Sequence, residues 1–252
     1  MPFFSLICPT RDRMIERSRL LNSLEDTITD SSQVEIIFII DKDDLRTQNS
    51  IKDSIERHKK LNIKYYARNR SYFLNRDYYN WASGLAEGEY HWAIGDDLVF
   101  KVKGWDTIIS EKIKEYVKFR PDNIVCAAIK DNTPKPSYHL PKFPCFPLVS
   151  KTAIRVLGFL LHPNIPTWGA DYALYCLYKK VNRLLLIEDR IYIEHISYHT
   201  KQANEDAISK RIGLIFNQLK MIPLYNVDRI VKEEVPLQAN ILMRYINERK
   251  EL

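Results

Sequence analysis

Short runs of β-branched and aromatic residues alternate with helical stretches along the chain, and this alternation constrains the fold more than any other feature. The runs at 3–8 and 34–40 are apolar almost throughout, which is typical of parallel strands buried on both faces. Between them, residues 14–28 carry apolar side chains every three or four positions, as on one face of a helix. The opening therefore predicts a βαβ unit.

The same alternation predicts an α/β fold with a mostly parallel central sheet and helices on both of its faces. Expected next are helices at 45–60, 74–86 and 105–119 and strands at 63–67, 90–94 and 124–129. Residues 130–147 are rich in proline and turn residues and predict a long loop. Expected beyond this loop are helices at 150–157 and 170–180, a strand at 184–196, and amphipathic helices after Ala203 and after Pro236.

Length and charge narrow the class of protein. The 252 residues fit one large domain or two small ones, and the net charge of +6 suits a polyanion, an anionic membrane face or a small phosphorylated ligand. Acids follow bases closely along the chain, as in Arg11-Asp12-Arg13, which does not favour nucleic acid as the main partner. The charge excess alone does not say which of these anionic partners binds.

The sequence also predicts a compartment. No apolar run reaches the roughly 18 residues that a membrane helix needs, and the run at 3–8 lacks a basic leader and stops at Pro9. The four cysteines lie far apart without zinc-ligand spacing, so free thiols are expected at Cys8, Cys126, Cys145 and Cys176. We expect a soluble cytoplasmic protein, with peripheral membrane contact at most.

Charged clusters follow several of the predicted strands. In open parallel sheets, ligands bind beyond the carboxyl ends of the strands. The clusters at those ends are Pro9-Thr10-Arg11, Asp41-Lys42-Asp43-Asp44, Arg68-Asn69-Arg70 and Gly95-Asp96-Asp97. Exposed paired acids such as Asp96 and Asp97 suit Mg²⁺ or Mn²⁺, which prefer oxygen ligands and can bridge two phosphate oxygens. An isolated Gly-Asp-Asp can equally be an Asx-type turn that caps the next segment.

The ordered set of motifs resembles glycosyltransferase family 2 and its GT-A relatives, over roughly the first 110 residues and more loosely to about residue 206. The segments that carry the resemblance are Ser5 to Arg13, Ile39-Ile40-Asp41, Ala67-Arg68-Asn69, Asn80-Trp81-Ala82, Ala86 to Tyr90 and Ile94 to Asp97. The resemblance implies a GT-A fold at 1–202, with a nucleotide-sugar-binding half at 1–110 and an acceptor-side half at 111–202. Residues 203–252 would form a C-terminal helical extension.

The resemblance also assigns roles to individual residues. Donor binding falls on Pro9, Thr10, Arg11, Asp41, Arg68 and Asp96. Asp97 aligns with the acid that normally holds Mn²⁺ or Mg²⁺, and His195 matches a late histidine that binds the same ion. The family's metal motif usually reads Asp-x-Asp, and its first acid falls on Gly95 here.

Two assignments leave alternatives open. His199 could replace His195, but in an extended segment the two rings lie roughly 13 Å apart, too far to bind one ion, and either can be a structural histidine. Asp171 resembles the family's general base, which accepts the acceptor's proton in an inverting transfer, although it can also cap the helix at 170–180. Candidates for pairing with the diphosphate are Arg11, Arg13, Arg68 and Arg76. Trp168 is a candidate for stacking on a sugar.

The activity implied is metal-dependent transfer of a sugar from a nucleotide-diphosphate sugar, with UDP-sugar favoured over GDP-sugar. The acceptor, whether glycan, lipid, protein or DNA, is not specified by the sequence. A sugar-phosphate nucleotidyltransferase is one alternative, although residues 9–13 lack the glycines of such enzymes. A non-catalytic module that binds nucleic acid or polysaccharide is another, suggested by the +6 charge and the 15 tyrosines.

Overall fold

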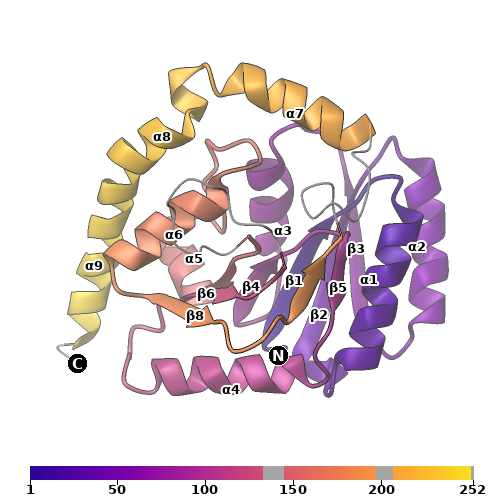
Figure 1. Ribbon diagram of the computed structural model, residues 1–252, viewed down its shortest axis with the longest axis horizontal. Helices are drawn as coiled ribbons and strands as arrows, with labels where there is room; N and C mark the ends of the chain where they lie inside the picture. Colours follow the sequence, from indigo (N-terminus) through magenta and orange to yellow (C-terminus); the bar gives the residue numbers. More distant parts are fainter. Residues whose placement is uncertain (133–144, 197–206, 251–252) are drawn as a thin grey trace.

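The computed structural model describes residues 1–132, 145–196 and 207–250. Its centre is a seven-stranded sheet in the order β3-β2-β1-β4-β7-β6-β8 (Figure 1). The strands are β1 (Phe4–Pro9), β2 (Val34–Asp41), β3 (Asn62–Arg68), β4 (Tyr90–Ala93), β6 (Cys126–Ile129), β7 (Leu148–Ser150) and β8 (Leu184–Ile187). β7 runs antiparallel to its two neighbours, and every other pairing in this sheet is parallel. The predicted α/β fold with a mostly parallel sheet is confirmed.

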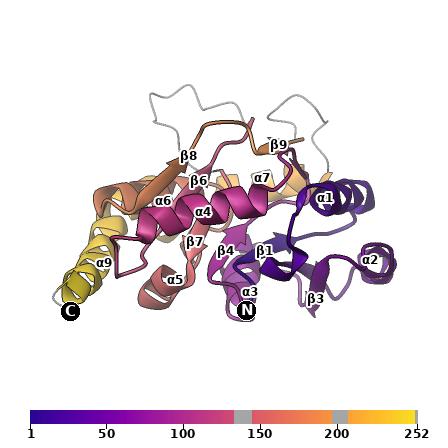
Figure 2. The same ribbon diagram turned by 90° about the horizontal axis from the view of Figure 1, so that it is seen from below.

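Helices cover both faces of the sheet (Figure 2). They are α1 (Met14–Thr27), α2 (Leu45–Arg57), α3 (Trp81–Ser83), α4 (Trp105–Val117), α5 (Lys151–Leu157) and α6 (Ala170–Lys180). Alternate residues of β1 and β2 point to opposite faces: Leu6 and Phe38 pack with α1 and α4, whereas Ile7 and Ile37 pack with α3, α5 and α6. Because both faces are buried, these strands carry no polar alternation, as their sequences predict.

The predicted helix at 74–86 ends earlier than expected, and most of it is a π-helix instead of an α-helix. A π-helical turn, Asn75–Asn80, leads into α3, and the helix ends before Gly84. The Asn75 side chain donates hydrogen bonds to the carbonyls of Ile165 and Thr167, 2.6 and 2.8 Å away. These bonds fasten the turn to the loop before α6, and such turns often mark functional sites.

The predicted strand at 184–196 is in fact two strands. The first half is β8, whereas β9 (Ile193–His195) leaves the main sheet and pairs antiparallel with β5 (Leu98–Phe100). The charged residues Glu188, Asp189 and Arg190 separate the two strands and explain the break. The small β5–β9 sheet places His195 opposite Leu98, directly after the predicted metal-binding acids.

The C-terminal region forms a helical arch along one side of the molecule (Figure 1). Its elements are α7 (Ala207–Leu219), η4 (Pro223–Tyr225), α8 (Val227–Arg229), η5 (Ile230–Glu234) and α9 (Val235–Lys250). The helix expected after Pro236 therefore begins earlier, because η5 runs into α9 without a break and Pro236 lies just after this π-helical turn. The boundary between a domain at 1–202 and an extension at 203–252 stays a prediction.

Two expectations about side chains and helices can be compared with the structure. All four cysteines are free thiols, with Cys8 and Cys126 buried and Cys145 and Cys176 partly exposed. Across the part of the chain that the structure describes, no helix combines the length and the apolar character needed to cross a bilayer.

Candidate active site

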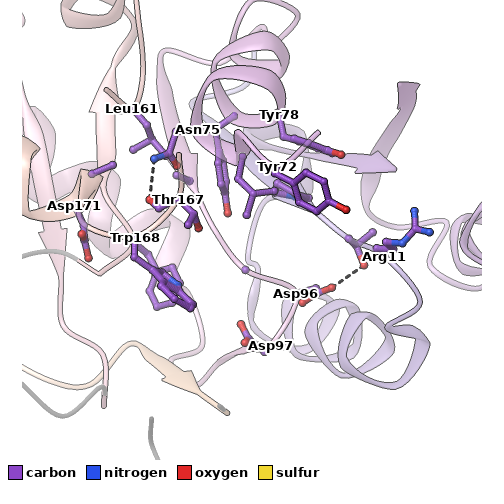
Figure 3. Close-up of a pocket in the computed structure, with 18 of the residues that line it drawn as sticks. Arg11, Tyr72, Asn75, Tyr78, Asp96, Asp97, Leu161, Thr167, Trp168 and Asp171 are labelled. Carbon is purple, nitrogen blue, oxygen red and sulfur yellow. Dashed lines mark hydrogen bonds between the residues drawn. The ribbon is translucent and has the colours of Figure 1, made fainter. Parts of the chain in front are cut away.

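A cavity of about 410 Å³ opens at the carboxyl edge of the parallel strands. Figure 3 shows Asp171 and Trp168 on one side of this cavity and Arg11 and Tyr72 on the other, with Asp96 and Asp97 between them. Sequence-predicted residues that line it are Pro9, Thr10, Arg11, Asp41, Asp96, Asp97, Asp171 and His195. Residues far apart in the sequence therefore meet at the edge of the sheet where ligands of such folds bind.

The two acids after β4 have different environments. Asp96 is buried, contrary to the expectation of an exposed pair, and it accepts hydrogen bonds from Thr10 Oγ1 at 2.7 Å and Arg13 Nη1 at 2.8 Å. Burial raises the pKa of Asp96 to about 6, against the opposing charge of Arg13. Asp97 is partly exposed to the cavity. Asp96 thus acts as a support that fixes Thr10 and Arg13, and Asp97 is the acid available to a ligand.

Gly95 explains the departure from an Asp-x-Asp motif. A Cβ atom at this position would lie 2.5 Å from Asp97 Oδ1, much closer than a van der Waals contact. An aspartate at position 95 would therefore push the Asp97 carboxylate out of its place. The observed orientation of the Asp97 side chain therefore requires a glycine at position 95.

His195 meets Asp97 across the small sheet. Pairing of β5 with β9 brings His195 Nε2 to 3.3 Å from Asp97 Oδ2, and Ile196 N donates to the Asp97 carbonyl at 2.9 Å. Burial opposes ionisation of Asp97, but His195 and Arg13 outweigh it and hold the pKa of this carboxyl below its usual range. An ionised carboxylate beside an imidazole nitrogen fits a divalent cation such as Mn²⁺.

The fit to a metal rests on these two side chains. Among the described residues, no group of three or more histidine, cysteine, aspartate or glutamate side chains is placed to hold an ion. A cation held here would take its remaining ligands from bound phosphate and water, as Mg²⁺ and Mn²⁺ commonly do. The alternative histidine, His199, lies outside the described residues.

The opposite end of the cavity is built around Asp41, at the end of β2. Its carboxylate accepts hydrogen bonds from Arg11 Nη1 at 2.7 Å and from the Tyr78 hydroxyl, which comes from the π-helical turn. Arg11 also binds Asp43 at 2.6 Å, and this hydrogen bond raises the pKa of its guanidinium. The charge of Arg11 is thus largely neutralised by two acids, which leaves it a weaker candidate for a diphosphate than the sequence predicts.

The structure does not bring Arg68 into the cavity. Its guanidinium lies over the rings of Tyr78 and Trp81, 5.2 and 5.3 Å from their centroids, and 3.8 Å from Asp77. Arg76 likewise binds Asp77, at 3.0 Å. Arg68 packs against the π-helical turn, Arg76 belongs to it, and neither lines the cavity.

The cavity is instead lined by Arg70 and Arg211, neither of which was predicted as a site residue from the sequence. Arg70 and Arg211 lie 5.4 and 5.5 Å from the centroid of the same ring, Tyr72, and all three side chains line the cavity. Neither guanidinium forms an ion pair with any other residue that the structure describes. Arg70 belonged to a recognised strand-end cluster, whereas nothing in the sequence around Arg211 signals that α7 reaches the cavity.

Asp171 lies in the first turn of α6, on the far wall. Gly169 precedes the helix with φ at +92°, a left-handed conformation that favours glycine and turns the chain into α6. The Asp171 carboxylate lines the cavity and accepts a hydrogen bond from Tyr172 N at 2.9 Å, while the N-cap position itself is held by Gly169. Burial raises the pKa of Asp171 to about 6, a value suited to proton transfer near neutral pH.

Comparison with solved structures identifies the fold. TarS of S. aureus, residues 1–349 in complex with UDP, superposes with a TM-score of 0.62 at 16% identity, over 100% of this chain and 72% of that chain. The mannosyltransferase PcManGT of Pyrobaculum calidifontis, with GDP-Man and Mn²⁺, has a TM-score of 0.58 at 13% identity, over 99% and 75%. GalNAc-T7 with UDP, GalNAc and Mn²⁺ has a TM-score of 0.59 at 11% identity, over 92% and 55%.

The chain therefore has the GT-A glycosyltransferase fold, as its sequence predicts. No protein-family model matches the sequence, and no curated protein matches it either. At identities of this level the likeness defines the fold, and the activity has to be argued from the side chains in the cavity.

Proposed function

We propose that this protein is a metal-dependent glycosyltransferase that moves a sugar from a nucleotide-diphosphate sugar to an acceptor. The observation that carries the proposal is the meeting of Asp97, His195 and Asp171 in one cavity of a GT-A fold. Structures with the same fold hold UDP, UDP-GlcNAc, or GDP-Man with Mn²⁺. This supports a nucleotide sugar as the donor, with a UDP-sugar favoured and a GDP-sugar as the alternative.

The nucleoside would lie at the Asp41 end of the cavity. Pro9, Thr10 and Arg11 form the adjoining wall, and Asp41 offers carboxylate oxygens to hydroxyl or base N–H groups. The diphosphate would then lie beside Arg70 and Arg211, because these guanidiniums lack acidic partners among the described residues. Forked N–H donors bind phosphate oxygens strongly, so this pair is better suited to the role than Arg11 or Arg68.

Asp97 and His195 would hold Mn²⁺ or Mg²⁺ between the donor and acceptor ends. Such a cation, when bound, neutralises the charge that develops on the departing diphosphate. Asp96 contributes indirectly, since its buried carboxylate fixes Thr10 and Arg13 beside Asp97.

Asp171 would act as the general base. Its carboxylate would accept the proton of the acceptor hydroxyl while that oxygen attacks the anomeric carbon, and the bond from this carbon to the diphosphate breaks on the opposite side. One carboxylate suffices for this single displacement, which inverts the anomeric centre. Trp168 is exposed beside Asp171 and offers an indole face on which an acceptor sugar can stack.

Titration calorimetry of UDP and GDP, each with and without MnCl₂, tests the proposal. We expect Mn²⁺-dependent binding of a nucleoside diphosphate by the wild type. Asp97→Ala should lose the dependence on Mn²⁺, whereas Asp53→Ala, which removes an exposed acid on α2, should behave as the wild type. A protein that binds neither nucleotide under any of these conditions would instead be a non-catalytic module.

A further inference from the structure

Large apolar side chains gather on the outer surface of α7 and η4. We define this surface, the α7–η4 face, by Lys210, Leu214, Lys220, Met221, Ile222 and Leu224. Met221 is 78% exposed and Leu214 is 67% exposed, and Ile222 and Leu224 are close to half exposed. Figure 1 shows α7 at the outer edge of the molecule, as part of the C-terminal arch.

The charge of the same segment has one sign. Residues 207–227 contain Lys210, Arg211 and Lys220 but no aspartate or glutamate. Residues 132–170 also lack an acid, so the absence of acids is not unique to this segment, but here it leaves the two lysines of the face without an acidic neighbour between Asp206 and Asp228. Lysine side chains that flank exposed leucine and methionine can reach outward to anionic groups while their methylenes lie along an apolar surface.

An apolar face rimmed by basic residues fits the interfacial region of an anionic bilayer. Apolar side chains enter the boundary between headgroups and acyl chains, and the basic side chains bind anionic headgroups. An acidic protein partner would complement only the lysines of this face. An apolar partner would complement only its leucine, isoleucine and methionine side chains. A bilayer interface supplies apolar and anionic contacts together over one broad surface, which favours it as the occupant.

The helix that carries the α7–η4 face also contributes to the wall of the cavity, which links membrane binding to the proposed activity. On its inner side α7 places Arg211 in the cavity wall, and a Cβ at Gly213 would lie 3.3 Å from the Trp168 ring. A membrane on the outer side of α7 would therefore be separated from the cavity wall by this one helix. If the proposed function holds, the acceptor hydroxyl belongs to a molecule at the membrane surface.

We propose that the α7–η4 face binds an anionic membrane surface. Flotation of the full chain with phosphatidylcholine vesicles, with and without phosphatidylglycerol, tests this. The protein should float with the anionic vesicles and not with phosphatidylcholine alone. Met221→Glu should weaken vesicle binding by about tenfold, from lost apolar burial and added repulsion.

Two matched controls separate this surface from general effects of the substitutions. Phe119→Glu alters a side chain that is 81% exposed next to α4, and it should bind vesicles as the wild type does. Lys220→Glu should weaken binding to anionic vesicles several-fold, whereas Lys52→Glu, on the exposed face of α2, should not.

Three results would overturn the proposal: no flotation with anionic vesicles, equal flotation with neutral ones, or equal losses in Met221→Glu and Phe119→Glu. A fourth contrary result can come from sedimentation analysis. If the wild type is a dimer and Met221→Glu is a monomer, the face binds a second copy of the chain and not a membrane. Nucleotide binding is measured on the same samples. If vesicles bind but UDP and GDP do not, the proposed function fails and the membrane surface stands.

Discussion

At the scale of single residues, the carboxyl group of Asp171 carries the clearest prediction. Burial raises its pKa from about 3.8 to about 6, so its ionised form destabilises the fold at neutral pH. The stability linked to this group is fully present below pH 4 and is lost as the pH rises through about 6. The same ionised form is the one that can accept a proton, so activity should rise over this pH window.

We therefore expect Asp171→Asn to separate stability from activity. It should lower kcat by roughly two to four decades, because the amide cannot accept a proton, and leave donor affinity nearly unchanged. It should also raise the melting temperature at pH 7.5, by about 2–4 °C for each kcal/mol recovered. Steady-state kinetics and calorimetry measure these effects at several pH values.

The stereochemistry of the product provides an independent check on Asp171. Proton NMR of the glycoside formed should show the anomeric configuration opposite to that of the donor. Retention of configuration would exclude a single displacement with Asp171 as its base. Asp228→Asn, which alters an exposed acid in α8, should leave rate, melting temperature and stereochemistry unchanged.

At the scale of elements, α7 supplies a side chain to a cavity formed largely by segments far away in the sequence. If Arg211 holds the diphosphate, Arg211→Ala should raise the Kd of UDP about tenfold, because a charge-assisted contact is lost. The affinity for uridine should stay unchanged, since it lacks the phosphates. Calorimetry with both ligands distinguishes this from general damage, and Lys210→Ala serves as the control from the exposed side of α7. Equal losses for UDP and uridine would remove Arg211 from this role.

Elements differ in how far the sequence could predict them. The buried parallel strands β1, β2 and β3 show as apolar runs, because burial on both faces leaves a local signature. β5 and β7 are only three residues long, and their pairing depends on partners about 20 to 100 residues away, which no local pattern reveals. The break between β8 and β9 differs, because the charged residues Glu188, Asp189 and Arg190 mark it locally in the sequence.

The residues of the candidate site also divide into those that the sequence indicated and those that only the tertiary structure reveals. The resemblance to GT-A enzymes singled out Asp97, Asp41 and Asp171, and the structure places all three on the cavity wall, while their roles stay predictions. The burial of Asp96 could not be predicted, since it depends on Thr10 and Arg13 folding over it. The exclusion of Arg68 and the inclusion of Arg211 likewise depend on tertiary packing against Trp81 and Tyr72.

At the scale of the whole molecule, the arch and the sheet share one core. α9 packs against α5 and α6, and its buried side chains join the cluster beneath the sheet that includes Val149 and Leu177. Among the side chains of the arch that the structure describes, the buried ones are Ile230, Val235, Ala239, Leu242 and Ile246. His162, buried before α6, also lies 3.2 Å from Glu234 of η5. These contacts predict that residues 203–252 unfold together with residues 1–202, although the two were distinguished by sequence.

Leu242→Ala tests this cooperativity. Leu242 is fully buried in the shared core, so its truncation should cost about 2–5 kcal/mol and lower the melting temperature by about 5–15 °C. The neighbouring Ile241 is 51% exposed, and Ile241→Ala should change stability by less than about 0.5 kcal/mol. Differential scanning calorimetry should show a single transition that moves as a whole in Leu242→Ala, because loss of the α9 contacts weakens the common core. Two transitions, with only the smaller one moved, would mean that the arch folds independently and that the GT-A domain is stable without it.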